Sequence, residues 1–141
     1  MAKIVCRQAK VDDVESFAMR PEDEDEARAL GWTGPGALRS SFDRSSECWA
    51  GEIDGKVFCL LGCVPGDVGA NVWMLFTDGV QTLPVEFFRK SRGHVRQMLD
   101  AYGELHSRTL PGNTFIIRWL RWLGFTREDT QPYLTFHLRG D

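Results

Sequence analysis

Hydrophobic and polar residues alternate along several segments of this chain and recur every three to four positions in others. Alternation predicts strands, because successive side chains of a strand point to opposite faces of a sheet. The run VWMLFT at 72–77 is continuously apolar, which is typical of a central strand covered on both faces. The predicted strands are 3–9, 48–52, 56–64, 72–77, 105–110, 125–127 and 133–139.

Apolar residues three and four positions apart predict helices in the intervening segments. We expect Asp12 or Asp13 to cap the first helix. Pro21 then opens a second helix, because proline fits the first turn, and the acidic run at 22–26 complements the helix dipole there. Two more helices are predicted at 37–41 and 84–102.

The order of these elements predicts one domain over residues 1–141. Antiparallel hairpins come early, with Asp54-Gly55 as the strongest turn signal, and helical crossovers come late. The expected fold class is therefore α/β (α+β), with a mixed central sheet of about six to seven strands flanked by helices.

The most informative segment is 105–125, LHSRTLPGNTFIIRWLRWLGF. A strand leads into a helix that begins at Asn113, a preferred N-cap residue, and ends before Gly124. Arg118 and Arg121 fall on the outer side of this helix, opposite its apolar stripes. The order of strand, Asn-capped helix and Leu-Gly-Phe exit resembles the C-terminal half of the GNAT acetyltransferase superfamily, and the spacing from Asn113 to Phe125 matches without a gap.

The wider chain is similar to a family of small proteins of podovirus-type tailed bacteriophages, which are GNAT-like in fold and catalogued as internal virion proteins. The likeness is carried by the strand at 73–76, the basic helix at 87–98 and the segment 112–124. This resemblance implies a place in the virion or the host cytoplasm, with virion or host proteins as partners.

The GNAT resemblance also implies where acetyl-CoA would bind, namely between the fourth and fifth strands with its pyrophosphate on backbone N–H groups at the start of the long helix. The residues that match these positions are Leu75, Phe76, Gly79 and Asn113. For Asn113, a purely structural role as an N-cap is the preferred interpretation over a cofactor contact.

Three features depart from a working GNAT site, one of them being Ile116, three residues after Asn113, where the family often has alanine. The phosphate-binding stretch at 77–86 has one glycine, no Gly-x-Gly, and a proline that removes an amide donor. Leu120 stands seven residues after Asn113, where many GNAT enzymes have a tyrosine that protonates the leaving thiolate, and leucine has no proton to donate. We therefore assign no catalytic residue and favour the absence of a cofactor, with acetyl-CoA as the alternative.

The net charge of −3 gives the chain no overall attraction to nucleic acid or to an anionic membrane. Basic residues nevertheless cluster on one predicted helix. A solvated helix face is the preferred interpretation, before a clamp for the CoA 3′-phosphate or a contact with nucleic acid, since no known nucleic-acid motif accompanies them. The cluster consists of Arg89, Lys90, Arg92 and Arg96.

The four cysteines form no CxxC pair and the three histidines are scattered, so no metal site is predicted. The N-terminus lacks the apolar core of a signal peptide and no apolar run reaches transmembrane length, so we expect no membrane contact. Two functions follow from these observations: a phage GNAT-like protein with a degenerate acetyltransferase site, or an active N-acetyltransferase with an atypical phosphate-binding loop.

Overall fold

The computed structural model of the chain describes residues 3–32, 36–77, 85–130 and 133–140. Within this part of the chain, seven strands form one mixed sheet in the order β1-β2-β3-β4-β5-β7-β6. The expected α/β class with its mixed sheet is confirmed. The strands are β1 (Ile4–Gln8), β2 (Glu47–Ile53), β3 (Lys56–Pro65), β4 (Ala70–Phe76), β5 (Glu104–Thr109), β6 (Thr126–Thr130) and β7 (Tyr133–Arg139).

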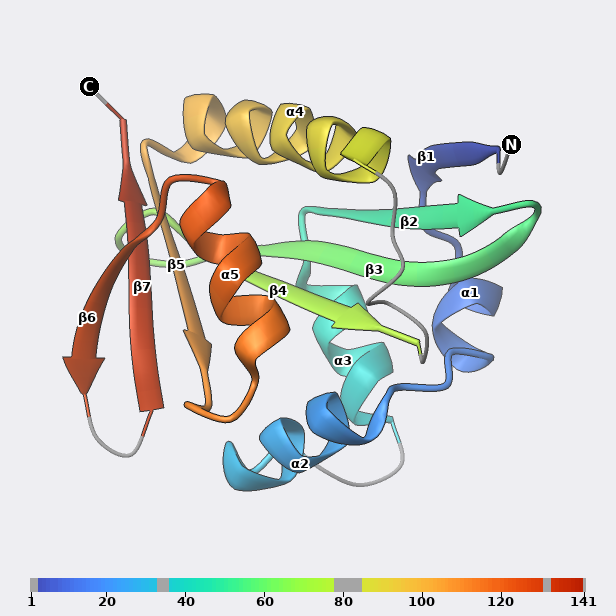
Figure 1. The fold of residues 1–141 in the computed structure, drawn as a ribbon, viewed down its shortest axis with the longest axis horizontal. Helices are drawn as coiled ribbons and strands as arrows, with labels where there is room; N and C mark the ends of the chain where they lie inside the picture. Colours follow the sequence, from blue (N-terminus) through green and yellow to red (C-terminus); the bar gives the residue numbers. More distant parts are fainter. Residues whose placement is uncertain (1–2, 33–35, 78–84, 131–132, 141) are drawn as a thin grey trace.

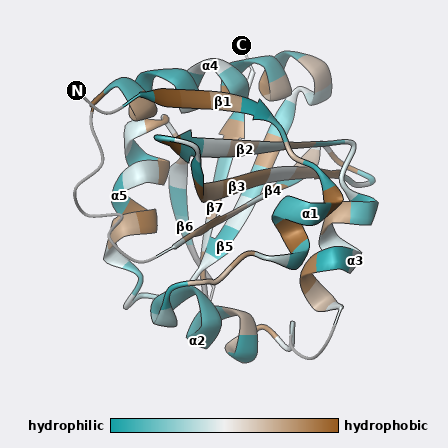
Figure 2. Ribbon diagram, turned by 90° about the vertical axis from the view of Figure 1, so that its right-hand side faces the viewer, coloured by the Kyte–Doolittle hydropathy of each residue, from teal (hydrophilic) through white to brown (hydrophobic). Residues whose placement is uncertain are grey.

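Five helices cover the sheet in the described residues. They are α1 (Val11–Glu15), α2 (Pro21–Ala29), α3 (Ala37–Arg44), α4 (Val85–Tyr102) and α5 (Thr114–Trp122). Figure 1 shows α5 in front of the sheet with α4 along its upper rim, and Figure 2 shows α1 and α3 on the opposite side. In both views α2 lies below the sheet, across the ends of its central strands.

The larger core lies between the sheet and the pair α4 and α5. It includes the fully buried side chains of Phe76, Met98, Trp119 and Leu120. Each large apolar side chain removed from water contributes about 1.5–3 kcal/mol, so this layer is the main source of stability. A smaller cluster around Leu60 fastens α1 and α3 to the other face.

The sheet divides into an antiparallel half and a second half that joins it through one parallel pair. β4 and β5 are paired only at Ala70 with Leu105 and Asn71 with His106. Beyond this pair Ser107 Oγ donates to the Val72 carbonyl oxygen at 3.1 Å, and the two strands then diverge. We call the opening between the diverging ends of β4 and β5 the V.

Several predicted boundaries need correction. The residue that caps α1 is Lys10, not Asp12 or Asp13, because Asp13 lies inside the helix and accepts the Lys10 N–H at 2.7 Å. The sixth strand is longer than the predicted 125–127, since β6 continues along its antiparallel partner β7. The residues at 78–84, including Gly79 and Pro84, lie outside the described part of the chain.

Candidate functional site

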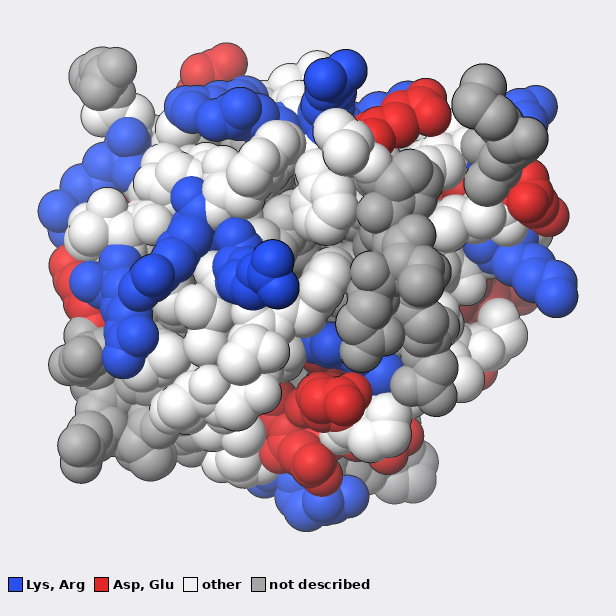
Figure 3. Space-filling view, viewed as in Figure 1, with Lys and Arg blue, Asp and Glu red and all other residues white. Residues whose placement is uncertain are grey.

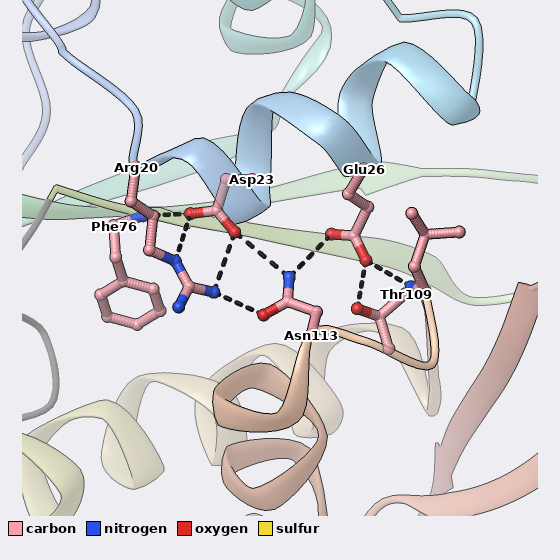
Figure 4. Close-up of polar contacts among 7 residues, drawn as sticks. Arg20, Asp23, Glu26, Phe76, Thr109 and Asn113 are labelled. Carbon is pink, nitrogen blue, oxygen red and sulfur yellow. Dashed lines mark hydrogen bonds and ion pairs between the residues drawn. The ribbon is translucent and has the colours of Figure 1, made fainter.

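The opening of the V between β4 and β5 holds a buried polar network that comes mainly from α2 (Figure 4). Its members lie far apart in the sequence and meet because α2 crosses the ends of both strands. Their burial is nearly complete, since Arg20 is 4%, Asp23 1% and Asn113 3% exposed. Polar groups so deeply buried are stable only where each finds a partner.

Asp23 is the centre of the network. Its two carboxylate oxygens accept from Arg20 Nε and Nη2, both at 3.1 Å, which is a bidentate ion pair. The same carboxylate accepts the backbone N–H of Phe76 at 2.9 Å. Asp23 thus accepts the hydrogen bond of a backbone N–H on the edge of β4 that faces the V.

Arg20 closes the contact from the other direction. Its backbone N–H donates to the Phe76 carbonyl oxygen at 2.9 Å, so both backbone groups of Phe76 are bound by α2 and its N-cap residue. Its guanidinium lies 5.9 Å from the centre of the Phe76 ring and 5.5 Å from that of Phe115. These ring faces attract the cation. The mouth of the V is therefore filled by a paired guanidinium.

Asn113 precedes α5 at the N-cap position, but its side chain makes no capping hydrogen bond. Its Oδ1 accepts from Arg20 Nη2 at 2.5 Å, and its Nδ2 donates to Asp23 Oδ1 at 3.3 Å and to Glu26 Oε2 at 3.4 Å. The interpretation of Asn113 as a side-chain cap is wrong. The amide is used instead to join the two carboxylates of α2.

Glu26 makes the equivalent contact at the other strand. Its Oε1 accepts the backbone N–H of Leu110 at 2.6 Å and the hydroxyl of Thr109, where β5 ends. Burial raises the pKa of the Glu26 carboxyl, and these hydrogen bonds oppose the rise. Helix α2 therefore spans the V, with Asp23 on β4 and Glu26 on the exit of β5.

A cleft of about 660 Å³ is lined by residues of α2 and α3 and by residues of the strands from β3 to β7. Asp23 and Glu26 form its wall towards the V, and His106 and His137 line it from β5 and β7. His106 Nε2 is 3.0 Å from Glu104 Oε2, and His137 Nδ1 is 2.8 Å from Glu128 Oε1. The indoles of Trp32 and Trp73 contribute to its apolar lining. Arg44 and Arg108 line the same cleft, so its walls carry charges of both signs.

The structure brings together two of the four residues assigned to the cofactor, since the Phe76 backbone and the Asn113 side chain both contact Asp23. Leu75, the preceding residue of β4, lines the cleft instead. Gly79 lies outside the described residues. Their role in cofactor binding stays a prediction.

The residues present do not fit acetyl-CoA in this arrangement. A cofactor arm placed between β4 and β5 would have to displace the contact of Asp23 with Phe76 and separate Arg20 from its carboxylate. The position expected for a general acid is Leu120, which is fully buried in the α5 core. A leucine at this position has no proton to donate.

Three carboxylates of the hairpin formed by β2 and β3 lie away from this network. Glu52 pairs with Arg7, Asp54 accepts the Lys3 N–H in the hairpin turn, and Glu47 accepts Trp49 Nε1 at 2.8 Å. None of the three is among the residues that line the cleft. Sequence reasoning missed Arg20, Asp23 and Glu26. It assigned the two carboxylates, as part of the acidic run at 22–26, to a dipole-complemented helix start and gave Arg20 no role. The available signal was the three-residue spacing of these side chains, which places them on one side of α2.

Within the described residues, no group of three His, Cys, Asp or Glu side chains is arranged to hold a metal ion. The helices described here are also too short or too polar to cross a membrane.

No protein-family model and no curated protein sequence matches the chain. Solved structures do match it in fold. The GNAT domain of S. lividans PAT aligns with a TM-score of 0.73 and 15% identity, over 99% of this chain and 90% of that one. An acetyltransferase from Agrobacterium tumefaciens aligns at 0.72 and 12%, over 97% and 91%. A Bacillus subtilis acetyltransferase in complex with CoA aligns at 0.66 and 6%, over the full length of both. These likenesses show the fold, and at such low identity they show nothing further.

Proposed function

We propose that this GNAT-fold protein acts by binding other macromolecules through its surface, in a tailed-phage virion or in the infected host, and that it does not transfer acetyl groups. The phage setting rests on the resemblance of its sequence to the small internal virion proteins. The loss of transferase activity rests on the geometry of the V between β4 and β5.

The observation that carries the proposal is the closure of that V by α2. Asp23 holds the Phe76 N–H at 2.9 Å, and the paired Arg20 guanidinium fills the opening. Removing either member to admit a cofactor would leave a buried charge without its partner, which costs about 3–5 kcal/mol. The affinity for acetyl-CoA would be lowered by this cost, because part of the binding free energy would be used to separate the pair.

The missing proton donor supports the same proposal. Leu120 is fully buried at the position where many GNAT enzymes have a tyrosine. The Tyr102 hydroxyl contacts Ser46 Oγ at the far end of α4. A chain without a donor at this point lacks general acid catalysis, which contributes about 10²–10⁴-fold to the rate of such reactions.

A second candidate function is an N-acetyltransferase, and the cleft beside α2 favours it. Glu26 has a raised pKa and lies at the wall of a 660 Å³ cleft, which is the arrangement that a base for an amine acceptor needs. In this alternative α2 would move away from the strands when acetyl-CoA binds.

Titration calorimetry of CoA and acetyl-CoA against the purified chain separates the two candidates. CoA binding by a structural neighbour makes these the ligands to test, and the B. subtilis acetyltransferase is the positive control. We expect no saturable heat up to about 1 mM ligand, which corresponds to less than about 4 kcal/mol of binding free energy. Micromolar binding overturns the proposal, and a screen of amine acceptors with a Glu26→Gln control then follows.

The virion part of the proposal has its own test. Mass spectrometry of gradient-purified virions of the encoding phage should detect the chain in fixed proportion to the capsid protein. Its complete absence from particles, with abundant protein in the infected cell, would place its partners in the host.

A further inference from the structure

Five arginines lie on the outer surface of the two helices that cover the main core. Arg89, Arg92 and Arg96 are spaced three and four positions apart along one side of α4, and Arg118 and Arg121 are three apart on α5. All five are exposed. Residues at these spacings share one side of a helix. We call this set the arginine face.

The two rows of the arginine face adjoin each other. The Arg92 guanidinium lies 4.8 Å from the centre of the Trp122 ring at the end of α5. Arg96 lies close to Gly124, the second residue after that helix. A Cβ atom at Gly124 would be 4.0 Å from Arg96 Nη2. Figure 3 shows Lys and Arg side chains gathered over α4 and α5, with a few acidic side chains among them on the upper rim and a larger acidic group below, around α2.

The arginine face lacks internal counter-ions. None of its five guanidinium groups lies within 4.0 Å of a carboxylate among the described residues, and Glu86 on the same helix is 3.4 Å from Lys90 instead. Asp100, four residues after Arg96, forms no ion pair with it. Five of the arginines elsewhere in the described residues are paired with carboxylates, namely Arg7, Arg20, Arg28, Arg39 and Arg139.

An unneutralised surface of this kind suits a polyanion. Guanidinium groups bind phosphate oxygens in a bidentate manner and are more weakly hydrated than ammonium groups. Trp122 is 40% exposed within the same surface, and an exposed indole gives nucleobases a ring to stack on.

We propose that the arginine face binds nucleic acid through its phosphate backbone, without reading base sequence. The basic residues of α4 alone are equally well explained as a solvated helix face. The structure adds the second row on α5 and the exposed Trp122 beside it. This inference rests on the proposed function in one respect, because it names a partner for a protein that acts through its surface.

The test is fluorescence anisotropy with a fluorescein-labelled DNA of arbitrary sequence, about 20 nucleotides long, as duplex and as single strand. If five phosphates are neutralised, duplex affinity should fall about 500-fold between 50 and 200 mM salt. The double variant Arg118→Gln/Arg121→Gln should bind more weakly and show a fall of only about 40-fold, since two contacts are lost. Both the duplex and the single-stranded probe should bind at about 50 mM salt. Changing the base sequence of the probe should not change its affinity.

The matched control is Arg28→Gln/Arg39→Gln, which removes the same charge from exposed arginines of α2 and α3 that are paired with carboxylates. It should keep both the affinity and the salt dependence of the natural chain. Equal losses in the two double variants, or no binding at 50 mM salt, would overturn the inference. So would equal competition by polyglutamate of the same charge, which would identify an acidic protein as the partner.

The two proposals fail separately. Absence of DNA binding with a silent CoA titration would remove nucleic acid as the partner and leave the binding role in place. CoA binding with normal DNA binding would overturn the proposed function and leave the arginine face.

Discussion

Replacement of Asp23 by alanine is the most direct perturbation of the network that closes the V. The side chain makes four hydrogen bonds, two from Arg20, one from the Phe76 backbone and one from Asn113. It is fully buried, and so is its partner, whose side chain is 4% exposed. Without Asp23 the Arg20 guanidinium keeps its hydrogen bond to Asn113 Oδ1 but loses its carboxylate partner.

The magnitude follows from the charge that is left behind. Removing one partner of a buried ion pair costs about 3–5 kcal/mol, because the remaining charge stays desolvated. The N–H of Phe76 also loses its acceptor, which adds about 1–3 kcal/mol unless water enters. We therefore expect Asp23→Ala to lower the free energy of unfolding by at least about 3 kcal/mol, a large part of the 5–15 kcal/mol that is typical of a domain.

Helix α2 supplies its own control. Asp25 pairs with Arg28 at 3.2 Å in the same i,i+3 arrangement, but both side chains are more than two-thirds exposed. Exposed pairs contribute about 0–1 kcal/mol, so Asp25→Ala should have little effect. Both variants are compared with the natural chain by urea unfolding, followed through the fluorescence of the tryptophans.

The double variant Arg20→Met/Asp23→Leu removes both charges of the buried pair. If an orphaned charge is what destabilises Asp23→Ala, removing both charges should recover most of the loss. A cost below about 1 kcal/mol for Asp23→Ala, equal to that of Asp25→Ala, would refute the claim that this network is a buried and essential contact. A double variant as unstable as the single one would show that hydrogen bonding to Phe76, not charge, dominates.

Two other predictions follow from the buried titratable groups. Burial raises the pKa of Glu26 in the folded chain. The contribution of this group to stability is therefore complete below the ordinary glutamate pKa and is lost as the pH rises through the raised folded value. Urea unfolding between about pH 4 and 8 should show this loss in the natural chain and not in Glu26→Gln. Three of the four cysteines are buried, and burial raises the thiol pKa of Cys48 and Cys63 to about 12. A thiol reagent at about pH 8 should therefore modify at most the half-buried Cys6 quickly in the native chain, and all four thiols only in denaturant. Rapid modification of more than one thiol in the native chain would contradict that arrangement. The buried cysteines are Cys48, Cys59 and Cys63.

The sequence was most informative where structure is local. Asp54-Gly55 specifies its hairpin because Asp54 and Gly55 both adopt positive φ in the turn, which the two residue types tolerate. The burial of Trp119 and Leu120 in α5 follows equally from helical spacing. Pro21 opens α2 for a reason that concerns only its own ring and N–H.

Asn113 marks the limit of such reasoning. Its position before α5 was predictable, since asparagine favours that place. The direction of its side chain was not, because the alternative partners Arg20 and Asp23 stand 93 and 90 positions away in the chain. A local preference worth about 1 kcal/mol yields to charged partners in a buried setting.

The sequence by itself therefore determined the helices and strands, their order and the class of fold, because periodicity and turn chemistry act over a few residues. Only the tertiary structure decided what the V contains and what the arginines share. Helix α2 meets the ends of β4 and β5 through contacts between residues 53 and 84 positions apart, and α4 meets α5 where Arg92 covers Trp122. Such contacts depend on how whole elements pack, and packing is set by the complete core and not by any one segment.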